Sequence, residues 1–369
     1  MKHEYRFLKP LVLLVGFVLP ANTSAQTAPE AGTPKPVAVA TDTSGSNTGL
    51  LFAHDDVLQF TLTCALRSLL KDRGDTPVGH PVLLTYSDRQ QQPVALPLTV
   101  SVRGNFRRQS SNCVYPPLLL DFPKKKTRKT LFDDQNKLKL VTHCQTEEYV
   151  VREYLVYKLY NLLTDISFRA RLARVTYADS MSKRVPETHW AFLLEDDNAM
   201  AKRNGGTVYK MKQIKTSYVD SLRMATVAVF EYMIGNTDWS VPYLHNIRLL
   251  AVDVGSAPVP VAYDFDHAGI VQAKYAFPAE QLNIESVRQR LYRGLPYPLA
   301  MFQKVFDRFI QVKPRIYALY ANETRLSPGY VKQTLRYLDE FYATINKPGM
   351  VRSEFLRGDR SGIVIKGLK

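Results

Sequence analysis

Apolar and polar residues alternate along most of the chain between residues 50 and 145, which is the pattern of half-buried β-strands. The clearest cases are the segments at residues 57–63, 82–86, 96–102 and 137–141. A further apolar segment runs from Leu118 to Phe122. Residues 65–71 suit either a helical turn or a strand end. The pattern predicts a β-rich first part of the folded chain.

Further along, apolar residues recur every three or four positions, as they do in amphipathic helices. One helix is predicted at residues 147–163, and another ends at Gly235, a residue type that suits a C-terminal cap. Three more helices are predicted at residues 280–293, 300–321 and 328–345. Ser327 and Pro328 form a typical N-cap and first-turn pair for the last of these. Residues 169–177 and 189–194 predict an antiparallel strand pair.

The start of the chain has a different composition. A basic stretch, a short apolar run at residues 11–19 and small residues before Gln26 predict a secretory signal peptide over residues 1–25. Residues 26–48 are rich in Ala, Thr, Pro, Ser and Gly, which predicts a flexible linker. No other run is apolar enough to span a bilayer, so we expect no transmembrane segment in the mature chain. The expected location is outside the cytoplasm, either periplasmic or extracellular.

The positive charge of the chain allows two interpretations, attraction to an acidic partner or a solvated basic surface. The formal net charge is +15, and the most basic run is Lys124-Lys125-Lys126-Thr127-Arg128-Lys129. We interpret this run as a solvated hairpin tip. No nucleic-acid-binding motif is present, so we expect no nucleic-acid partner. The pattern names neither a protein substrate nor an envelope component, and it does not indicate an oligomeric state.

The chain has three cysteines, Cys64, Cys113 and Cys144. In an oxidising compartment one pair can form and one thiol is left over. Cys113 and Cys144 both lie next to predicted strands, and we favour that pair. The spacings match neither a zinc site nor a cysteine or serine nucleophile set.

Acidic and amide residues gather after the helix that ends at Gly235. Asp238 opens a loop, Asn246 precedes an apolar strand at residues 247–252, and a second strand at residues 259–263 ends in Asp264-Phe265-Asp266. Mg²⁺ prefers hard oxygen ligands such as these carboxylates. Phosphoryl transfer uses one Asp to orient the acceptor hydroxyl and another to hold the metal. The order of the residues therefore favours magnesium and phosphate chemistry.

Several short motifs occur along the chain in a fixed order. They are Arg103-Gly104-Asn105, the apolar strand ending at Asp121-Phe122, Lys137-Leu138-Lys139-Leu140, the strand ending at Glu195, Val208-Tyr209-Lys210, Asn236-Thr237-Asp238, Asn246 and Asp264-Phe265-Asp266. In this order the chain, from about residue 95 to 275, resembles the CotH family, the spore-coat-type atypical protein kinases. The family often has an Arg after the loop Asp, where this chain has Trp239.

The resemblance implies an α+β, two-lobed protein-kinase-like fold. The β-rich N-terminal lobe would cover residues 49–197 and the mainly helical C-terminal lobe residues 198–350. A loose basic tail would follow at residues 351–369.

The resemblance also implies roles for particular residues. Asp238 would be the catalytic residue, and Asp264 and Asp266, assisted by Asn246, would hold Mg²⁺ or Mn²⁺. For ATP, Lys139 or Lys137 would contact phosphates, and Glu153 on the next helix would position that lysine. Arg103 would face phosphate, and Glu195 would lie where adenine binds. The implied function is an exported kinase that transfers a phosphoryl group from ATP to a protein hydroxyl.

Two other functions use the same residues. One is a catalytically inactive, pseudokinase-like protein of the cell envelope that binds nucleotide or metal, or acts as a scaffold. Trp239 and the lack of a Gly-rich phosphate loop favour it, whereas the retention of all three Asp opposes it. The other is a metal-dependent hydrolase, which the lack of a His-rich cluster disfavours.

Overall fold

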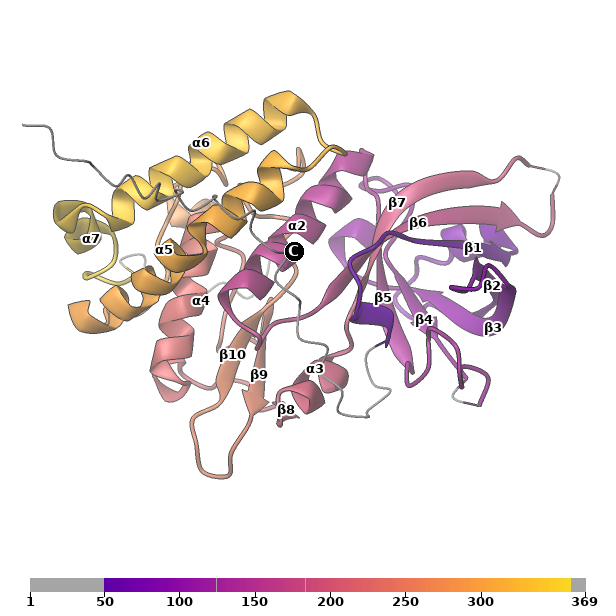
Figure 1. Ribbon diagram of the computed structural model, residues 1–369, viewed down its shortest axis with the longest axis horizontal. Helices are drawn as coiled ribbons and strands as arrows, with labels where there is room; N and C mark the ends of the chain where they lie inside the picture. Colours follow the sequence, from indigo (N-terminus) through magenta and orange to yellow (C-terminus); the bar gives the residue numbers. More distant parts are fainter. Residues whose placement is uncertain (1–49, 124, 183, 360–369) are drawn as a thin grey trace, which may run out of the picture. The chain divides into compact units, whose positions relative to one another are not determined.

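Seven strands of the chain close into a barrel. The structure is a computed structural model that describes residues 50–123, 125–182 and 184–359 (Figure 1). The barrel strands are β1 (Leu58–Cys64), β2 (His80–Ser87), β3 (Pro93–Val102), β4 (Leu118–Asp121), β5 (Lys137–Thr142), β6 (Ala170–Asp179) and β7 (Glu187–Leu194). Their order around the barrel is β1-β2-β3-β4-β5-β7-β6. Leu62, Leu84, Val100 and Leu120 are among the buried residues of its core.

The barrel closes because β1 has a partner on each side. It pairs antiparallel with β2 and parallel with β6, from Leu58 opposite Ala173 to Cys64 opposite Asp179. The other neighbouring strands are antiparallel. Closure leaves no exposed strand edge to be protected.

The expected two-lobed protein-kinase-like fold is therefore wrong. The strands that were expected to form the β-rich N-terminal lobe form a closed mixed barrel, accompanied by seven α-helices in the described part of the chain. All described residues also belong to one compact unit, without a division at residue 197. Alternation of apolar residues predicts which face of a strand is buried but not which strands are neighbours.

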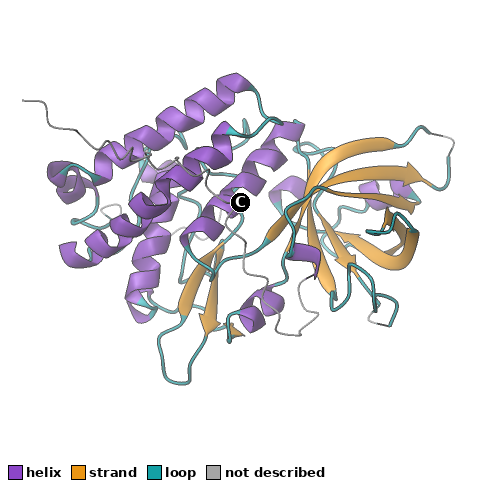
Figure 2. Ribbon diagram, in the orientation of Figure 1, coloured by secondary structure: helices purple, strands orange, loops and turns teal. Residues whose placement is uncertain are grey.

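A second sheet and most of the helices follow the barrel strands (Figure 2). The sheet has the order β10-β9-β8 and consists of β8 (Thr207–Tyr209), β9 (Ile247–Ala251) and β10 (Val259–Ala262). The helices are α1 (Leu66–Lys71), α2 (Glu147–Leu163), α3 (Asp197–Arg203), α4 (Ser221–Ile234), α5 (Leu299–Ala321), α6 (Pro328–Ile345) and α7 (Pro348–Glu354). Short 3₁₀ turns are η1 (Leu50–Phe52), η2 (Phe106–Arg108), η3 (Thr216–Tyr218) and η4 (Glu280–Leu282).

Helix α2 connects the barrel to the helical part. It packs on β6 and β7 on one side and on α5 on the other. Val156, Tyr157, Leu159 and Tyr160 are all buried, and they belong to one core together with residues of α4, α5 and α6. A helix that is apolar on most sides is one that is buried on most sides. The elements beside α2 are therefore fixed relative to it.

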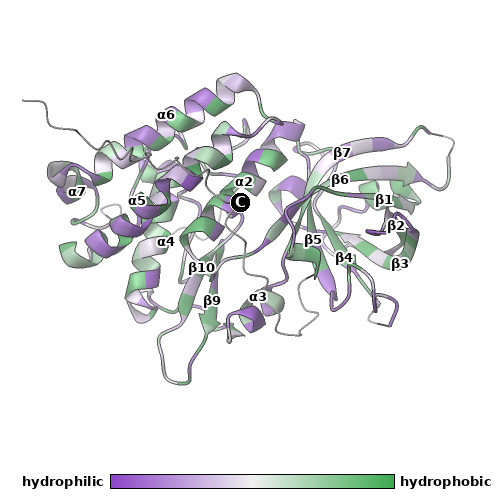
Figure 3. Ribbon diagram, in the orientation of Figure 1, coloured by the Kyte–Doolittle hydropathy of each residue, from purple (hydrophilic) through white to green (hydrophobic). Residues whose placement is uncertain are grey.

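Most predicted helices are confirmed. The helix at residues 147–163 has the bounds of α2, and the helix at residues 328–345 has those of α6. Hydrophilic and hydrophobic residues alternate along α5 and α6 in Figure 3, as the periodicity predicted. Ser327 is at the N-cap position of α6, but its side chain makes no capping hydrogen bond.

Two helical predictions need correction. Residues 280–293 form only the short turn η4 followed by irregular chain. Arginine side chains hold this segment in place, since Arg288 and Arg290 donate to the carbonyls of Gly269 and Met233. At the other end, residues 351–354 of the expected loose tail are helical and belong to α7. The predicted signal peptide and linker, and residues 360–369 of the predicted tail, lie outside the described residues.

The favoured disulfide is confirmed: Cys113 is bonded to Cys144, and Cys64 is a free, buried thiol. The bond joins the β3–β4 connection to the β5–α2 connection. As for membranes, no helix in the described ranges has the length and apolar character that crossing a bilayer requires.

A substitution of Phe355, just after α7, tests whether this end of the chain is packed on the fold. Its side chain is fully buried, with ring centroids 4.9 Å from Tyr232, 5.1 Å from Tyr292 and 5.2 Å from Phe306. We expect Phe355→Ala to lower the free energy of unfolding by about 3–5 kcal/mol, because it leaves a cavity in an aromatic cluster. Urea unfolding measures the loss. Met350→Ala, on the exposed side of α7, is the control, and an equal effect of the two would contradict the packing.

Candidate functional site

Asp238 lies in a loop that begins where α4 ends. Gly235 has the left-handed φ of 69°, and a Cβ at this position would lie 2.2 Å from the Tyr337 hydroxyl, so only glycine fits. The chain therefore turns sharply into Asn236, whose side-chain oxygen accepts a 3.0 Å hydrogen bond from the Asp238 N–H. Arg293 donates to the carbonyls on either side of Asp238, those of Thr237 and Trp239. The loop is held at both ends and the Asp238 side chain is largely buried.

Two residues orient the Asp238 carboxylate. His245 Nε2 lies 2.7 Å from Oδ1, and Asn246 donates to Oδ2 at 3.1 Å and to the Asp238 carbonyl at 2.7 Å. The contacts of Asn246 are those of an orienting residue, and its assistance to a metal stays a prediction. His245 was not singled out from the sequence. Its position directly before Asn246 is the feature of the sequence that could have indicated a place in the site.

Asp264 and Asp266 follow β10, as predicted. Phe265 between them is fully buried and packs on Tyr157 and Phe230, with ring centroids 4.7 and 5.4 Å away. The N–H of Asp264 donates to the Tyr157 hydroxyl at 2.9 Å, with the Asp264 backbone at a positive φ of 64°. The buried ring thus fixes the backbone that presents both carboxylates.

Glu153 has a different cationic partner from the one predicted. It is 1% exposed on α2, and Arg107 of η2 donates to it at 3.1 Å. Arg107 also donates to the Thr142 carbonyl and lies 4.0 Å from Asp266. Burial disfavours the guanidinium charge, but Tyr275, Glu153, Asp266 and Asp264 together raise the pKa of Arg107. Glu153 therefore anchors Arg107, and the predicted pairing of Glu153 with Lys139 is wrong.

Lys139 is held by an acid from another element. Its Nζ lies 2.7 Å from Asp197 at the start of α3, and Arg248 of β9 contacts the same carboxylate at 2.6 Å. Desolvation, followed by the neighbouring charges of Arg103 and Arg248, lowers the pKa of Lys139 in spite of Asp197. Lys137 instead pairs with Asp121, directly opposite on β4, and both are exposed. Of the two lysines, Lys139 lies with the other charged residues.

Arg103 is a further positive charge in the cluster formed by Asp238, Asp264, Asp266, Arg107 and Lys139. It is partly buried and close enough for its charge to act on both Asp264 and Lys139. Within the described ranges, its side chain makes no hydrogen bond or ion pair. A guanidinium with free donors is suited to bind phosphate.

Glu195 is occupied by other contacts. It follows Leu194, the cross-strand partner of Lys139, but both of its carboxylate oxygens bind Arg203. One of them also accepts from the Arg169 N–H. These contacts fasten α3 to the barrel, and the predicted role at an adenine site stays a prediction.

The acids at the centre of the cluster influence one another. Asp264 is exposed to solvent, but the neighbouring protein removes part of the hydration of its carboxyl. This desolvation raises the pKa of the carboxyl, and the charges of Asp266 and Asp238 raise it further. Arg103 and Arg107 act in the opposite direction. No group of three or more His, Cys, Asp or Glu side chains in the described part of the chain is arranged to hold a metal ion. A metal held by Asp264 and Asp266 would therefore need ligands from its substrate or from water.

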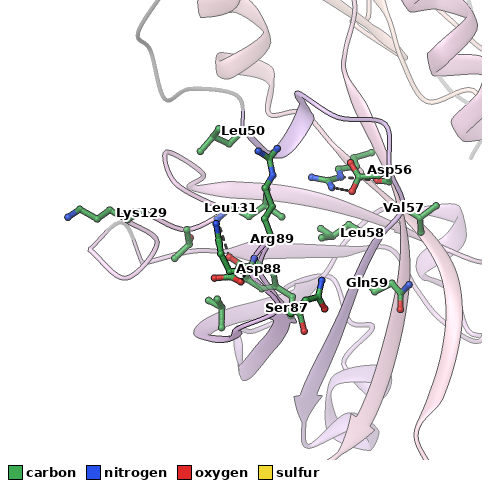
Figure 4. A pocket seen from close by; sticks show the side chains of 16 residues that line it. Leu50, Asp56, Val57, Leu58, Gln59, Ser87, Asp88, Arg89, Lys129 and Leu131 are labelled. Atoms are coloured by element: carbon green, nitrogen blue, oxygen red, sulfur yellow. Dashed lines mark hydrogen bonds and ion pairs between the residues drawn. The ribbon is translucent and has the colours of Figure 1, made fainter. Parts of the chain in front are cut away.

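A cavity of about 650 Å³ opens at one end of the barrel (Figure 4). None of the charged residues described above in this subsection lines it. Arg171 is bound to Asp56 at 2.7 Å, and Asp88 accepts hydrogen bonds from N–H groups of its own turn. We assign no chemistry to it.

The sequence matches no protein-family model, and no curated protein matches it at a significant level. The resemblance to the CotH family thus stays an expectation that rests on the quoted motifs. Of the predicted residues, the structure brings together Asp238, Asn246, Asp264, Asp266, Glu153, Lys139 and Arg103. The sequence reasoning missed His245, Asp197, Arg248 and the role of Arg107.

The buried pair Arg107–Glu153 can be tested by a mutant cycle. We expect Arg107→Met to lower the free energy of unfolding by about 3–5 kcal/mol, because Glu153 is left buried without a counter-charge. Adding Glu153→Leu removes both charges and should recover most of that loss in urea unfolding.

Lys137→Met is the control for this cycle, since it breaks the exposed pair with Asp121 and should cost less than about 1 kcal/mol. If Arg107→Met lowers the free energy of unfolding no more than this control does, the buried pair does not stabilise the contact between the β3–β4 connection and α2.

His245 makes the stability of the Asp238 loop depend on pH. Burial lowers the pKa of His245, but the hydrogen bond to Asp238 and the charges of Asp238 and Asp264 raise it above its ordinary value of 6.5. The stabilisation by protonated His245 is therefore complete below about pH 6.5 and disappears as pH rises through the raised folded-state pKa.

We expect wild type to exceed His245→Gln in unfolding free energy by on the order of 1 kcal/mol near pH 6, and by less as pH approaches about 9. Urea unfolding of both proteins across this range measures the difference. A difference that grows with pH would contradict a charged His245–Asp238 contact. His54→Gln, an exposed position, controls for general effects of pH.

Proposed function

We propose that the protein is an exported, Mg²⁺-dependent kinase that transfers a phosphoryl group from ATP to a protein hydroxyl. The observation that carries the proposal is the juxtaposition of the Asp238 and Asp264 loops: Asn246 donates to the Asp238 carboxylate at 3.1 Å, and its carbonyl accepts a 3.0 Å hydrogen bond from the N–H of Tyr263, the residue before Asp264. One of the two acids, Asp238, is firmly oriented, by His245 and Asn246, as a proton acceptor must be. The other, Asp264, follows the buried strand β10 and is close enough to Arg103 for the two charges to interact.

In this proposal each residue has one task. Asp238 orients the acceptor hydroxyl and takes its proton as the oxygen attacks the terminal phosphorus of ATP, while the bond to ADP breaks. Asp264 and Asp266 would hold Mg²⁺, which when bound screens the charge of the phosphates. Arg103 and Lys139 would contact phosphate oxygens. Arg107 and Glu153 act by keeping these elements in place.

The proposed location outside the cytoplasm has support of its own. The Cys113–Cys144 disulfide is of a kind that persists in oxidising compartments and is rare in the cytosol. It lies in the connection that also contains Arg107, so its loss would affect the site.

A non-catalytic protein that binds nucleotide or metal is the second candidate. Two observations favour it: Lys139 is engaged by Asp197, and Asn246 directs its amide to Asp238. In that case Asp238 would have a structural role, and ligand would bind without turnover.

Substitution of the two acids distinguishes these candidates. At ligand about a hundredfold above Kd, Mg²⁺-ATP should stabilise the wild type by about 2.7 kcal/mol, a thermal shift of a few degrees. Asp264→Asn should abolish the part of the shift that needs Mg²⁺. Asp238→Asn should keep the shift but lower the rate of transfer by roughly 10²–10⁴-fold, because the proton acceptor is lost.

Asp253→Asn, on the exposed β9–β10 hairpin, is the matched control and should behave as wild type. Unchanged transfer by Asp264→Asn would refute the assignment. A Mg²⁺-dependent shift without any transfer by the wild type would favour the non-catalytic candidate. Because Asp264 must lose its proton to hold a cation, the shift should also weaken as pH falls below the raised pKa of Asp264.

A further inference from the structure

The segment from residue 210 to residue 218 lies beside the Asp238 loop. It leaves β8, runs without regular structure and enters η3. The N–H of Gln213 donates a 2.7 Å hydrogen bond to the carbonyl of Pro242, in the loop that follows Asp238. The segment is therefore attached to the loop that presents the proposed catalytic acid.

A small cavity of about 160 Å³ lies between the two. Thr216 of the segment, residues 239–242 of the Asp238 loop, residues 293–296 and Asp359 line it. Arg293 on its wall donates to the carbonyls of Thr237 and Trp239, and the charge of Asp238 acts on Arg293. The cavity thus borders the backbone of Asp238. It is smaller than the usual pocket for a free small molecule, and it has room for a side chain.

The rim beside this cavity is positively charged. Lys210, Lys212 and Lys215 are all exposed, and across the described residues none of them is in an ion pair. The nearby acids have other roles: Asp359 on the cavity wall pairs with Arg293 at 3.9 Å, Asp220 caps α4, and Asp253 is on the β9–β10 hairpin. Met211 and Tyr218 of the same segment are 60% and 63% exposed. Charges of one sign that are not paired within the protein attract a partner of the opposite charge.

We propose that residues 210–218, together with this cavity, bind an acidic stretch of the acceptor protein, so that the hydroxyl presented to Asp238 is flanked by Asp or Glu. The inference rests on the proposed kinase function and names its substrate class. A single exposed lysine–carboxylate pair contributes little, but three lysines raise the local concentration of an acidic chain and speed its association. The preference should therefore appear in KM and decrease with salt.

Three peptides test the proposal. They share one central Ser and differ only in whether the flanking positions are Glu, Ala or Lys. We expect the full chain with Mg²⁺-ATP to phosphorylate the Glu peptide at least tenfold better in kcat/KM than the Lys peptide at low salt. The difference should lie mainly in KM and shrink as salt is raised. Equal or reversed preference would overturn the proposal.

Charge reversal locates the effect. Lys210→Glu/Lys212→Glu/Lys215→Glu should reduce or invert the preference. The matched control, Lys125→Glu/Lys126→Glu/Arg128→Glu, reverses three exposed charges on the loop before β5 and should keep it. If both triple variants lose the preference equally, net charge explains it and the proposed surface is wrong.

Binding of the labelled peptides without ATP separates this inference from the proposed function. Glu-peptide binding that depends on the three lysines, without any phosphoryl transfer, would refute the kinase and support the surface. Transfer to all three peptides alike would support the kinase and refute the surface. Vesicles with anionic lipid serve as a further probe, and tighter lysine-dependent binding to them than to the Glu peptide would overturn the proposal in favour of a membrane contact.

Discussion

The buried ion pair between Arg107 and Glu153 is the constraint on which the candidate site depends. Arg107 comes from the β3–β4 connection and Glu153 from α2, and neither charge could be left unpaired away from water without a cost of several kcal/mol. The connection must therefore stay on α2, and Arg103 is carried into place with it. The Cys113–Cys144 disulfide joins the same connection to the chain just before α2. An ionic and a covalent constraint thus act on one segment.

The carboxylates on the other side are positioned by packing instead. Gly235 allows α4 to end where a side chain would collide with Tyr337, and this puts the Asp238 loop against the end of β10. Phe265 buries its ring among aromatic residues of α2 and α4, and this fixes Asp264 and Asp266. Because α2 contributes both to this packing and to the ion pair with Arg107, the two halves of the site meet on one helix.

Local features of the sequence predicted local features of the fold. The spacing of apolar residues predicted α2 and α6 within their observed bounds, and Gly235 predicted the end of α4. Barrel closure was not predicted, because it depends on the pairing of β1 with β6, which are far apart in the sequence. The predicted partner of Glu153 was wrong for the same reason, because contacts between residues far apart in the sequence decide it. Lys139, on the strand before α2, was the candidate nearer in sequence. The observed partner of Glu153 is Arg107 in the β3–β4 connection, and that of Lys139 is Asp197 in α3.

The charge balance of the cluster shows what kind of ligand it favours. Lys139 and Arg248 share Asp197, and Arg107 is paired with Glu153, so these charges largely compensate one another. Arg103 is close enough for its charge to act on Asp264, while His245 contacts Asp238 at 2.7 Å and Arg107 lies 4.0 Å from Asp266. Carboxylates in this environment favour a divalent cation as their counter-charge, and once it is bound they tolerate an anionic ligand beside it. This order, cation before phosphate, is what makes a Mg²⁺–nucleotide complex a better candidate for the site than a free nucleotide.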